Sequence, residues 1–362
     1  MKLLLAGGGT AGHIEPALAV ARGWIATHPE DQVCFLGTSS GLEITLVPKA
    51  GYTLLTIPKV AISRRLSPSL LKVPIQLATS ILATMKHLNQ VDCAIGFGGY
   101  VSAPLYVAAK LKRVPYVIHE QNAKPGWSNR IGALMTPFVA MSSPVENKGF
   151  HKAILTGLPL RGDVISAISQ AQGDWNTARI EAKQRVCKRY ALSADHPLVF
   201  IFGGSQGSQA INKVIYESQP ELTAKGYSLL HGVGKANEIP TANPYYKAVG
   251  YIDEMADCYL AADILISRSG AVTCAEATAL SRFTLFIPLP IGNGEQALNA
   301  KALVAAGRAR LIDQKDFTSE WLTNNIDGLL SESRRRPAEG ETSGVHATDK
   351  IISIIEQAAG VK

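Results

Sequence analysis

Short apolar runs alternate along the chain with longer stretches of helical composition, such as Pro16–Thr27, and the alternation starts again after Ser193. Strands of a parallel sheet that is covered on both faces have this appearance, because neither of their sides meets water. A βαβα order of elements therefore predicts a parallel sheet between two layers of helices. The expected strands are Leu3–Ala6, Gln32–Leu36, Cys93–Gly96, Tyr116–His119, Val139–Met141 and Ala153–Leu155, and then Leu198–Phe202, Tyr227–His231, Ala248–Val249, Ile264–Ile266, Thr284–Ile287 and Ala309–Ile312.

Two such series predict an α/β protein with two tandem, doubly wound, Rossmann-like domains, and 362 residues exceed what one ordinary core accommodates. We expect an N-terminal domain over 1–160 and a C-terminal domain over 161–344. A polar, irregular stretch over 331–344 precedes a last helix at about 345–362, which we expect to pack back on the first domain. Because ligands of such folds bind beyond the carboxyl ends of the strands, the interdomain cleft is the expected active site.

The formal net charge of +7 belongs to the N-terminal half. Residues 1–160 contain 15 Lys+Arg and 7 Asp+Glu, whereas the remainder contains 21 and 22. A basic surface attracts nucleic acid, anionic lipid or phosphorylated substrates, although it can also serve solubility alone. Five cysteines without a C-x-x-C pair favour a reducing cytosol over a disulfide framework or a zinc site.

Three glycine-rich loops directly follow predicted strands, at Gly7–Gly12, Gly96–Gly99 and Gly203–Gly207. Glycine lets the backbone turn tightly, and the N-terminus of a following helix favours phosphate. The first loop also satisfies the G-x-G-x-x-G dinucleotide fingerprint, so an NAD-linked dehydrogenase is an alternative. His13, directly after that loop, and the separate loop of the second domain argue against this alternative.

These motifs together resemble the MurG family of N-acetylglucosaminyltransferases, from Gly7 to about Ala300. The family has the two-domain glycosyltransferase-B fold, and the resemblance implies inverting transfer of N-acetylglucosamine from UDP-GlcNAc to an undecaprenyl-diphosphate-linked muramyl-pentapeptide, lipid I, which gives lipid II. The motifs that carry the resemblance are GGT-x-GH-x-x-P around His13, GGYVS at Gly98–Ser102, HEQN at His119–Asn122, GGSQG at Gly203–Gly207, and RSGA at Arg268–Ala271 followed by Glu276.

His13 is the expected catalytic base, because an imidazole titrates near neutral pH and the residue follows the first predicted strand. A role in binding phosphate or in packing is the alternative. The amide of Asn122 suits sugar hydroxyls, as the resemblance also implies, although an Asx turn before Pro125 would explain it too. Arg161 at the domain junction suits the leaving diphosphate, with an interdomain salt bridge as the alternative.

For Glu276 the resemblance implies contact with the ribose hydroxyls of UDP, while the pattern Thr273-x-x-Glu276 alone would suggest a capping box. The resemblance also implies that the backbone of Ile252 reads uracil and that Gln296 contacts the donor sugar. The expected donor-binding residues are Thr10, Ala11, Gly12, Asn122, Arg161, Ser205, Ile252, Ala271, Val272, Thr273, Cys274, Ala275, Glu276 and Gln296, and those expected at the acceptor diphosphate are Gly8, Gly9, Gly98, Gly99 and Tyr100.

The chain contains no Asp-x-Asp motif, which metal-dependent sugar transferases often use to hold a divalent ion. We therefore expect neither a metal nor a cofactor. The leaving diphosphate would instead be neutralised by the N–H groups of the Gly203–Gly207 loop, by Ser205 and by Arg161.

The stretch Leu66–Leu88 combines apolar residues at near-helical spacing with flanking cations. One face packed on the sheet is one interpretation, and docking on an anionic bilayer is the other. We favour docking, because a polyprenyl acceptor cannot leave the membrane. The expected partners are thus UDP-GlcNAc, lipid I and an anionic membrane at the cytoplasmic face of the bacterial plasma membrane, without nucleic acid. The residues expected at the membrane are Arg64, Arg65, Lys72, Ile75 and Lys86.

The chain departs from the family pattern at Ala11, which replaces a glycine, at Leu158, which replaces an asparagine, and at Gly294–Gln296 in the donor loop. These changes concern local geometry and sugar contacts rather than the class of reaction. Other two-domain UDP-sugar enzymes, such as a UDP-GlcNAc 2-epimerase or a diacylglycerol glycosyltransferase, remain related alternatives, and an inactive nucleotide-sugar-binding subunit is a third.

Overall fold

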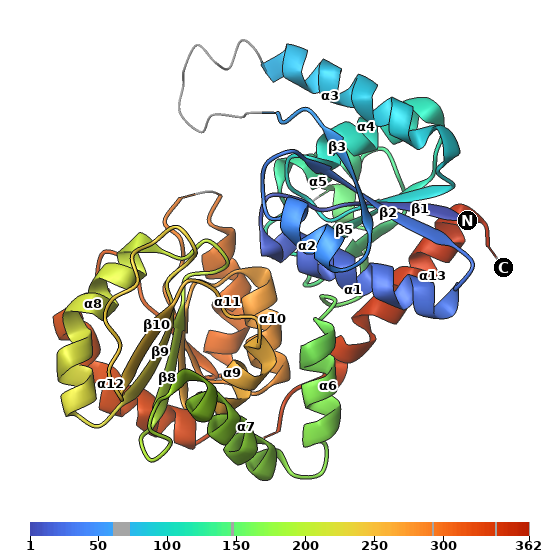
Figure 1. Cartoon of the computed structure of the whole chain (residues 1–362). Helices are drawn as coiled ribbons and strands as arrows, with labels where there is room; N and C mark the ends of the chain where they lie inside the picture. Colours follow the sequence, from blue (N-terminus) through green and yellow to red (C-terminus); the bar gives the residue numbers. More distant parts are fainter. Residues whose placement is uncertain (61–72, 146–147, 292, 337–338, 362) are drawn as a thin grey trace. The chain divides into compact units, whose positions relative to one another are not determined.

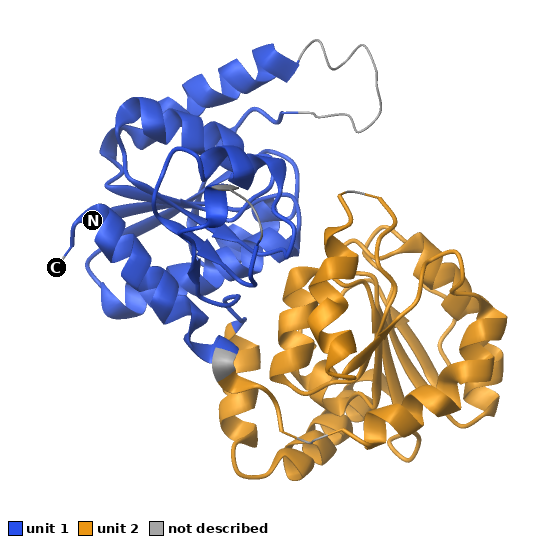
Figure 2. Cartoon of the chain, turned by 180° about the vertical axis from the view of Figure 1, so that it is seen from behind, with its two compact units in different colours: residues 1–161, 344–362 blue, residues 162–343 orange. Residues whose placement is uncertain are grey.

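The structure, a computed structural model, describes residues 1–60, 73–145, 148–291, 293–336 and 339–361 (Figure 1). The chain divides into two compact units, Met1–Arg161 with Gly344–Lys362, and Gly162–Ser343, which Figure 2 shows in blue and orange. Each unit is built on its own sheet, and every described pairing of named strands is parallel. The predicted fold class, two doubly wound α/β domains, is confirmed.

The first sheet has the strand order β3-β2-β1-β4-β5-β6-β7. Its third strand was not predicted, because it lies at the edge of the sheet, is only partly buried and includes two threonines, so no continuous apolar run marks it. The strands are β1 (Lys2–Ala6), β2 (Gln32–Thr38), β3 (Thr53–Ile57), β4 (Cys93–Gly96), β5 (Tyr116–Glu120), β6 (Val139–Met141) and β7 (Ile154–Leu155).

Helices cover both faces of this sheet, and successive residues of β1 point to opposite faces, as the period of a strand requires. Leu3 and Leu5 belong to one core cluster, together with α1 (Ala11–Thr27), α2 (Glu43–Lys49) and the C-terminal α13 (Ala347–Ala359). Leu4 and Ala6 belong to the opposite cluster. The helices on that side are α3 (Val73–His87), α4 (Ser102–Lys112) and α5 (Trp127–Gly132).

The second sheet has the order β10-β9-β8-β11-β12-β13. Its strands are β8 (Leu198–Phe202), β9 (Ser228–Gly232), β10 (Tyr246–Val249), β11 (Ile264–Ser267), β12 (Thr284–Phe286) and β13 (Ala309–Leu311). One core cluster joins this sheet to α8 (Gln209–Ala224) and α12 (Ser319–Arg334). The other helices are α6 (Gly162–Ala171), α7 (Trp175–Tyr190), α9 (Met255–Ala261), α10 (Ala271–Ala279) and α11 (Glu295–Ala305).

In each sheet the winding direction reverses once, between β1 and β4 in the first and between β8 and β11 in the second. The loops on either side of a reversal run apart over opposite faces, which leaves a crevice where open α/β sheets bind ligands. The three glycine loops follow β1, β4 and β8, so all three lie at these reversal points.

Several predicted boundaries were wrong. Helix α1 begins at Ala11, directly after the first glycine loop, and contains Pro16 rather than starting there. Helix α12 continues to Arg334, so the first part of the stretch 331–344 is helical. None of the described helices is long and apolar enough to span a membrane.

Ile351 of α13 is fully buried in the core cluster that includes Leu3 and Trp24. Its substitution therefore tests whether α13 completes the core of the first unit. We expect Ile351→Ala to lower the free energy of unfolding of this unit by about 2–5 kcal/mol through loss of burial and a residual cavity. Chemical denaturation with a probe in each unit measures this effect. The exposed Ser353→Ala on the same helix is the control, and equal stabilities of the two variants would contradict the assignment.

Candidate active site

His13 lies in the first turn of α1, between the glycine loops that follow β1 and β4. A Cβ atom built on Gly98 would lie 3.4 Å from His13 Nε2, and one on Gly99 would lie 3.6 Å from its Nδ1. The two glycines have φ angles of +92° and +81°. Glycine adopts such left-handed backbone at no steric cost, and here it also lets the second loop approach the imidazole.

The imidazole is set up to accept a proton. Burial lowers the pKa of His13 below its ordinary value, while a hydrogen bond to the backbone of Gly8 and the charge of Glu43 oppose this shift. The neutral form, which can act as a base, therefore predominates at neutral pH. Thr10 Oγ1 lies 3.3 Å from the ring Nδ1.

Glu43, at the start of α2, is hydrogen-bonded to the backbone of the first glycine loop. The residue is 1% exposed, and its carboxylate accepts hydrogen bonds from Gly9 N at 2.8 Å, from Thr38 N at 3.1 Å and from Thr38 Oγ1 at 2.9 Å. The N–H of Gly9 is thus already engaged by a carboxylate. Sequence reasoning missed this residue, because nothing in its neighbourhood distinguishes it from a surface acid.

A second buried carboxylate, Glu120 at the end of β5, organises the segment that contains Asn122. It accepts from Asn122 N at 2.8 Å, from Gly126 N at 3.2 Å and from Asn129 Nδ2 at 2.9 Å. Burial raises the pKa of Glu120, and these hydrogen bonds oppose the rise. Asn129 in turn accepts from the hydroxyl of the buried Tyr106. The backbone position of Asn122 is therefore fixed from within the unit.

Two further predicted residues of the first unit have different surroundings. Tyr100 is 37% exposed beside the Gly98–Gly99 loop, where its side chain is open to a ligand. Arg161 pairs with Glu15 of α1 at 3.8 Å within the same unit. Its guanidinium thus stands beside the turn that carries His13.

The predicted donor residues of the second unit lie at the carboxyl ends of four strands. Ser205 follows β8, Ile252 follows β10, the 271–276 segment follows β11, and Gln296 follows β12. In a parallel sheet these ends share one edge. Ile252 is buried against Gly232 at the end of β9, and Gln296 Oε1 accepts a hydrogen bond from Leu289 N at 2.9 Å, which closes the loop before α11.

Arg268 joins three loops at this edge. Its guanidinium donates to Ser208 Oγ at 2.8 Å, to Ile287 O at 3.0 Å and to Pro288 O at 3.1 Å, and also to Gln314. Ser208 caps α8 directly after the glycine loop. The buried cation therefore ties that loop to the segment that leads to Gln296, and it places a positive charge beside the glycine loop.

The alternative interpretation of Glu276 as part of a capping box was wrong. Helix α10 begins at Ala271 with Gly270 as its N-cap, so Thr273 lies within the helix. Glu276 is 1% exposed in the middle of α10. Capping thus gives no reason for a carboxylate at this position.

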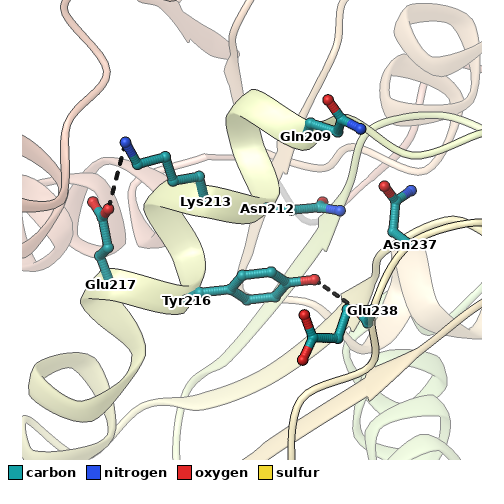
Figure 3. Close-up of a pocket in the computed structure, with 7 residues that line it drawn as sticks. All are labelled: Gln209, Asn212, Lys213, Tyr216, Glu217, Asn237 and Glu238. Atoms are coloured by element: carbon teal, nitrogen blue, oxygen red, sulfur yellow. Dashed lines mark hydrogen bonds and ion pairs between the residues drawn. The ribbon is translucent and has the colours of Figure 1, made fainter.

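A separate hollow of about 380 Å³ lies between α8 and the segment after β9. Figure 3 shows Tyr216, whose hydroxyl donates to Glu238 O, next to the ion pair of Lys213 with Glu217. None of the predicted site residues lines it. Among the described residues, no cluster of three or more His, Cys, Asp or Glu side chains is arranged to hold a metal ion.

Both halves of the chain match glycosyltransferase family 28, the N-terminal domain over residues 3–141 and the C-terminal domain over 198–356. Two curated relatives bear the name UDP-N-acetylglucosamine–N-acetylmuramyl-(pentapeptide) pyrophosphoryl-undecaprenol N-acetylglucosamine transferase. The protein of Thermobifida fusca is 41% identical over 95% of this chain and 89% of its own length. That of Corynebacterium glutamicum strain R is 42% identical over 92% and 90%.

Among solved structures, MurG of Acinetobacter baumannii matches with a TM-score of 0.67 and 26% identity, over 98% of this chain and 99% of its own. A UDP-GlcNAc 2-epimerase from Neisseria meningitidis matches with a TM-score of 0.65 at 15% identity, over 99% and 100%. This second likeness concerns the fold alone.

Arg268 yields a prediction for the second unit. We expect Arg268→Met to lower its free energy of unfolding by about 2–4 kcal/mol, because four acceptors, two of them in fully buried hydrogen bonds, lose a charged donor. Urea titration measures the loss. Arg310→Met is the matched control, since Arg310 is 44% exposed and its ion pair with Glu332 contributes less than about 1 kcal/mol. Equal effects of the two substitutions would refute the bridging role.

Proposed function

The chain belongs to the family of UDP-N-acetylglucosamine–N-acetylmuramyl-(pentapeptide) pyrophosphoryl-undecaprenol N-acetylglucosamine transferases. We propose that its reaction inverts the configuration at the anomeric carbon of the donor sugar and that its turnover needs no metal ion. It transfers N-acetylglucosamine from UDP-GlcNAc to the C4 hydroxyl of the muramyl sugar of lipid I. The product is lipid II, an intermediate of peptidoglycan synthesis. The curated relatives support this function over the alternatives of a UDP-GlcNAc 2-epimerase, a diacylglycerol glycosyltransferase and a dehydrogenase.

The observation that carries the mechanism is the position of His13 between two glycine loops at the reversal point of the first sheet. The neutral imidazole takes the proton of the acceptor hydroxyl as that oxygen attacks the anomeric carbon. The bond from this carbon to the diphosphate breaks on the opposite side, so the configuration inverts and UDP leaves. The proton on His13 then passes to solvent.

We assign the acceptor diphosphate to the first unit. Gly98 and Gly99 lie next to His13, and Gly8, Gly9 and Tyr100 belong to the same two loops. Three of these glycines, Gly9, Gly98 and Gly99, have left-handed backbone, which lets the chain come close to a ligand. Since the N–H of Gly9 donates to Glu43, we give the larger share of the binding to the Gly98–Gly99 loop.

The donor belongs to the second unit. Ser205 and the loop around it bind the diphosphate, supported by the cation of Arg268. Glu276 accepts from the ribose hydroxyls, Ile252 reads uracil and Gln296 contacts the sugar. Loop N–H groups and a guanidinium neutralise the leaving group in the way an oxyanion site does, which is why we propose metal-independent turnover. Asn122 and Arg161 complete the donor contacts from the first unit.

The test is UDP release with lipid I as acceptor. We expect His13→Ala to bind both substrates and to lose turnover by about 10²–10⁴-fold. The wild-type rate should fall on the acidic side as the imidazole is protonated, below the ordinary histidine value of about 6.5, because burial lowers the pKa of His13. Excess EDTA should leave the rate unchanged.

His28→Ala, at the other end of α1, is the control and should keep its activity. Near-normal turnover of His13→Ala would contradict the role of His13 as the catalytic base. Loss of activity in EDTA that Mg²⁺ or Mn²⁺ restores would contradict metal independence. The same anomeric configuration in donor and product would contradict inversion.

We also propose that α3 rests on the cytoplasmic face of the plasma membrane as part of a peripheral attachment. The residues that α3 buries are polar: Ser80 donates to Pro58 O, and Thr84 donates to Ser80 O. Its apolar residues Ile75 and Leu82 are 68% and 61% exposed, and Lys86 is exposed beside them. Arg64, Arg65 and Lys72 lie outside the described residues. An apolar face with adjacent cations is suited to anionic lipid.

Vesicle sedimentation with anionic phospholipid tests this attachment. We expect Ile75→Glu with Leu82→Glu, or charge reversal of Arg64, Arg65 and Lys72, to weaken binding at least about tenfold, since each basic residue near the surface contributes about 1 kcal/mol. UDP-GlcNAc affinity should not change. Ile180→Glu, at a 59% exposed apolar position of α7, is the control. Unaltered vesicle binding by both sets would exclude this surface.

A further inference from the structure

The peptide group that joins Gly8 to Gly9 is hydrogen-bonded on both sides. Its N–H, which belongs to Gly9, donates to Glu43 Oε2 at 2.8 Å. The carbonyl oxygen of Gly8, on the other side of the same peptide, lies near the imidazole of His13, since a Cβ on Gly99 would be 3.1 Å from Gly8 O and 3.6 Å from His13 Nδ1. A hydrogen bond from the imidazole to the Gly8 backbone raises the pKa of His13. A carboxylate and the catalytic imidazole therefore contact opposite ends of one peptide dipole.

The charge of Glu43 has no cationic partner among the described residues. Its three hydrogen bonds come from neutral groups, the N–H of Gly9 and the N–H and hydroxyl of Thr38. With 1% of the residue exposed, water screens this charge little. A buried negative charge at this place costs folding free energy, and stabilisation of a nearby positive charge would offset that cost.

We propose that Glu43 is a positioning residue that acts on His13 through the Gly8–Gly9 peptide. This inference rests on the proposed function. As one ring nitrogen takes the proton of the acceptor hydroxyl, the other keeps its N–H bonded to the Gly8 carbonyl. The carboxylate polarises the peptide and stabilises the imidazolium that forms, and the same contacts orient the ring. His13 itself receives only the proton, which it later gives to solvent, and Glu43 exchanges no group.

The loop is packed so closely that a side chain on Gly8 or Gly99 would have to displace its neighbours. A Cβ on Gly8 would lie 3.0 Å from Glu43 Oε1, and a Cβ on Gly99 would lie 3.1 Å from Gly8 O. The peptide is thus confined between α2 on one side and the loop after β4 on the other. Confinement of this kind keeps the two hydrogen bonds aligned during the reaction.

Other titratable groups near His13 are engaged elsewhere. Glu120, which lies beyond Asn129 and the Gly98 loop, accepts from Asn122, Gly126 and Asn129. On α1 itself, Glu15 pairs with Arg161. Glu43 is the carboxylate that is hydrogen-bonded to the peptide that His13 contacts.

The test is Glu43→Gln, which keeps the shape of the side chain and removes its charge. Loss of the negative charge disfavours the imidazolium, so the pKa of His13, followed by NMR of labelled histidine without substrates, should fall by about one unit. The acidic limb of kcat/KM should move to lower pH by the same amount, and kcat should fall about tenfold. UDP affinity should stay at the wild-type value.

Thr38→Val is the matched control, because it removes one hydrogen bond to Glu43 but keeps the charge. It should leave the pKa of His13 and the acidic limb in place. An unchanged His13 pKa in a UDP-binding Glu43→Gln protein, or an equal shift in Thr38→Val, would overturn the proposal. Should Glu43→Gln fail to fold, Glu43→Asp withdraws the carboxylate from Gly9 and should give a smaller fall. The NMR titration needs no turnover, so it separates this proposal from a failure of the proposed function.

Discussion

All strands of each sheet run in one direction, and the rest of the structure follows from this constraint. Parallel strands need crossover helices, the helices bury both faces of the sheet, and every strand delivers its carboxyl end to the same edge. Residues far apart in sequence, such as His13 and Gly98, meet there because β1 and β4 are neighbours. The sheet thus determines where the functional groups lie, and the loops and helix starts that follow its strands supply those groups.

The sequence predicted the two-domain α/β fold because buried parallel strands leave uninterrupted apolar runs. It missed β3, whose edge position removes that signal, and it misplaced the start of α1, because Pro16 usually marks a first turn. The edges of a sheet and the ends of a helix depend on tertiary neighbours. Because the sequence pattern contains little information on those neighbours, it predicts the boundaries of elements less well than their existence.

The residues that we propose to contact ligands were easier to predict than those that hold the loops around them. Glycine loops and His13 stand out because their residue types are unusual after a strand. Glu43 does not, and Glu120 and Arg268 were noticed only as members of motifs, without a role. An acid or a base is ordinary anywhere on a surface and becomes informative only once it is buried. Glu43 and Arg268 each hold backbone that is distant in the sequence, and such contacts are set by the fold. Glu120 holds the loop that directly follows its own strand, and its burial is what the sequence does not show.

The first unit is discontinuous in the chain, because its core includes Ile351 and Ile355 of α13. A ribosome releases residues in order, so the segment 162–343 can leave the exit tunnel and fold while the unit that holds His13 still lacks its last helix. The usual N-to-C order of domain folding is therefore reversed for the final step. A chain that stops short of α13 would lack part of the core of the unit that holds His13, so this unit completes its packing only after α13 has been made.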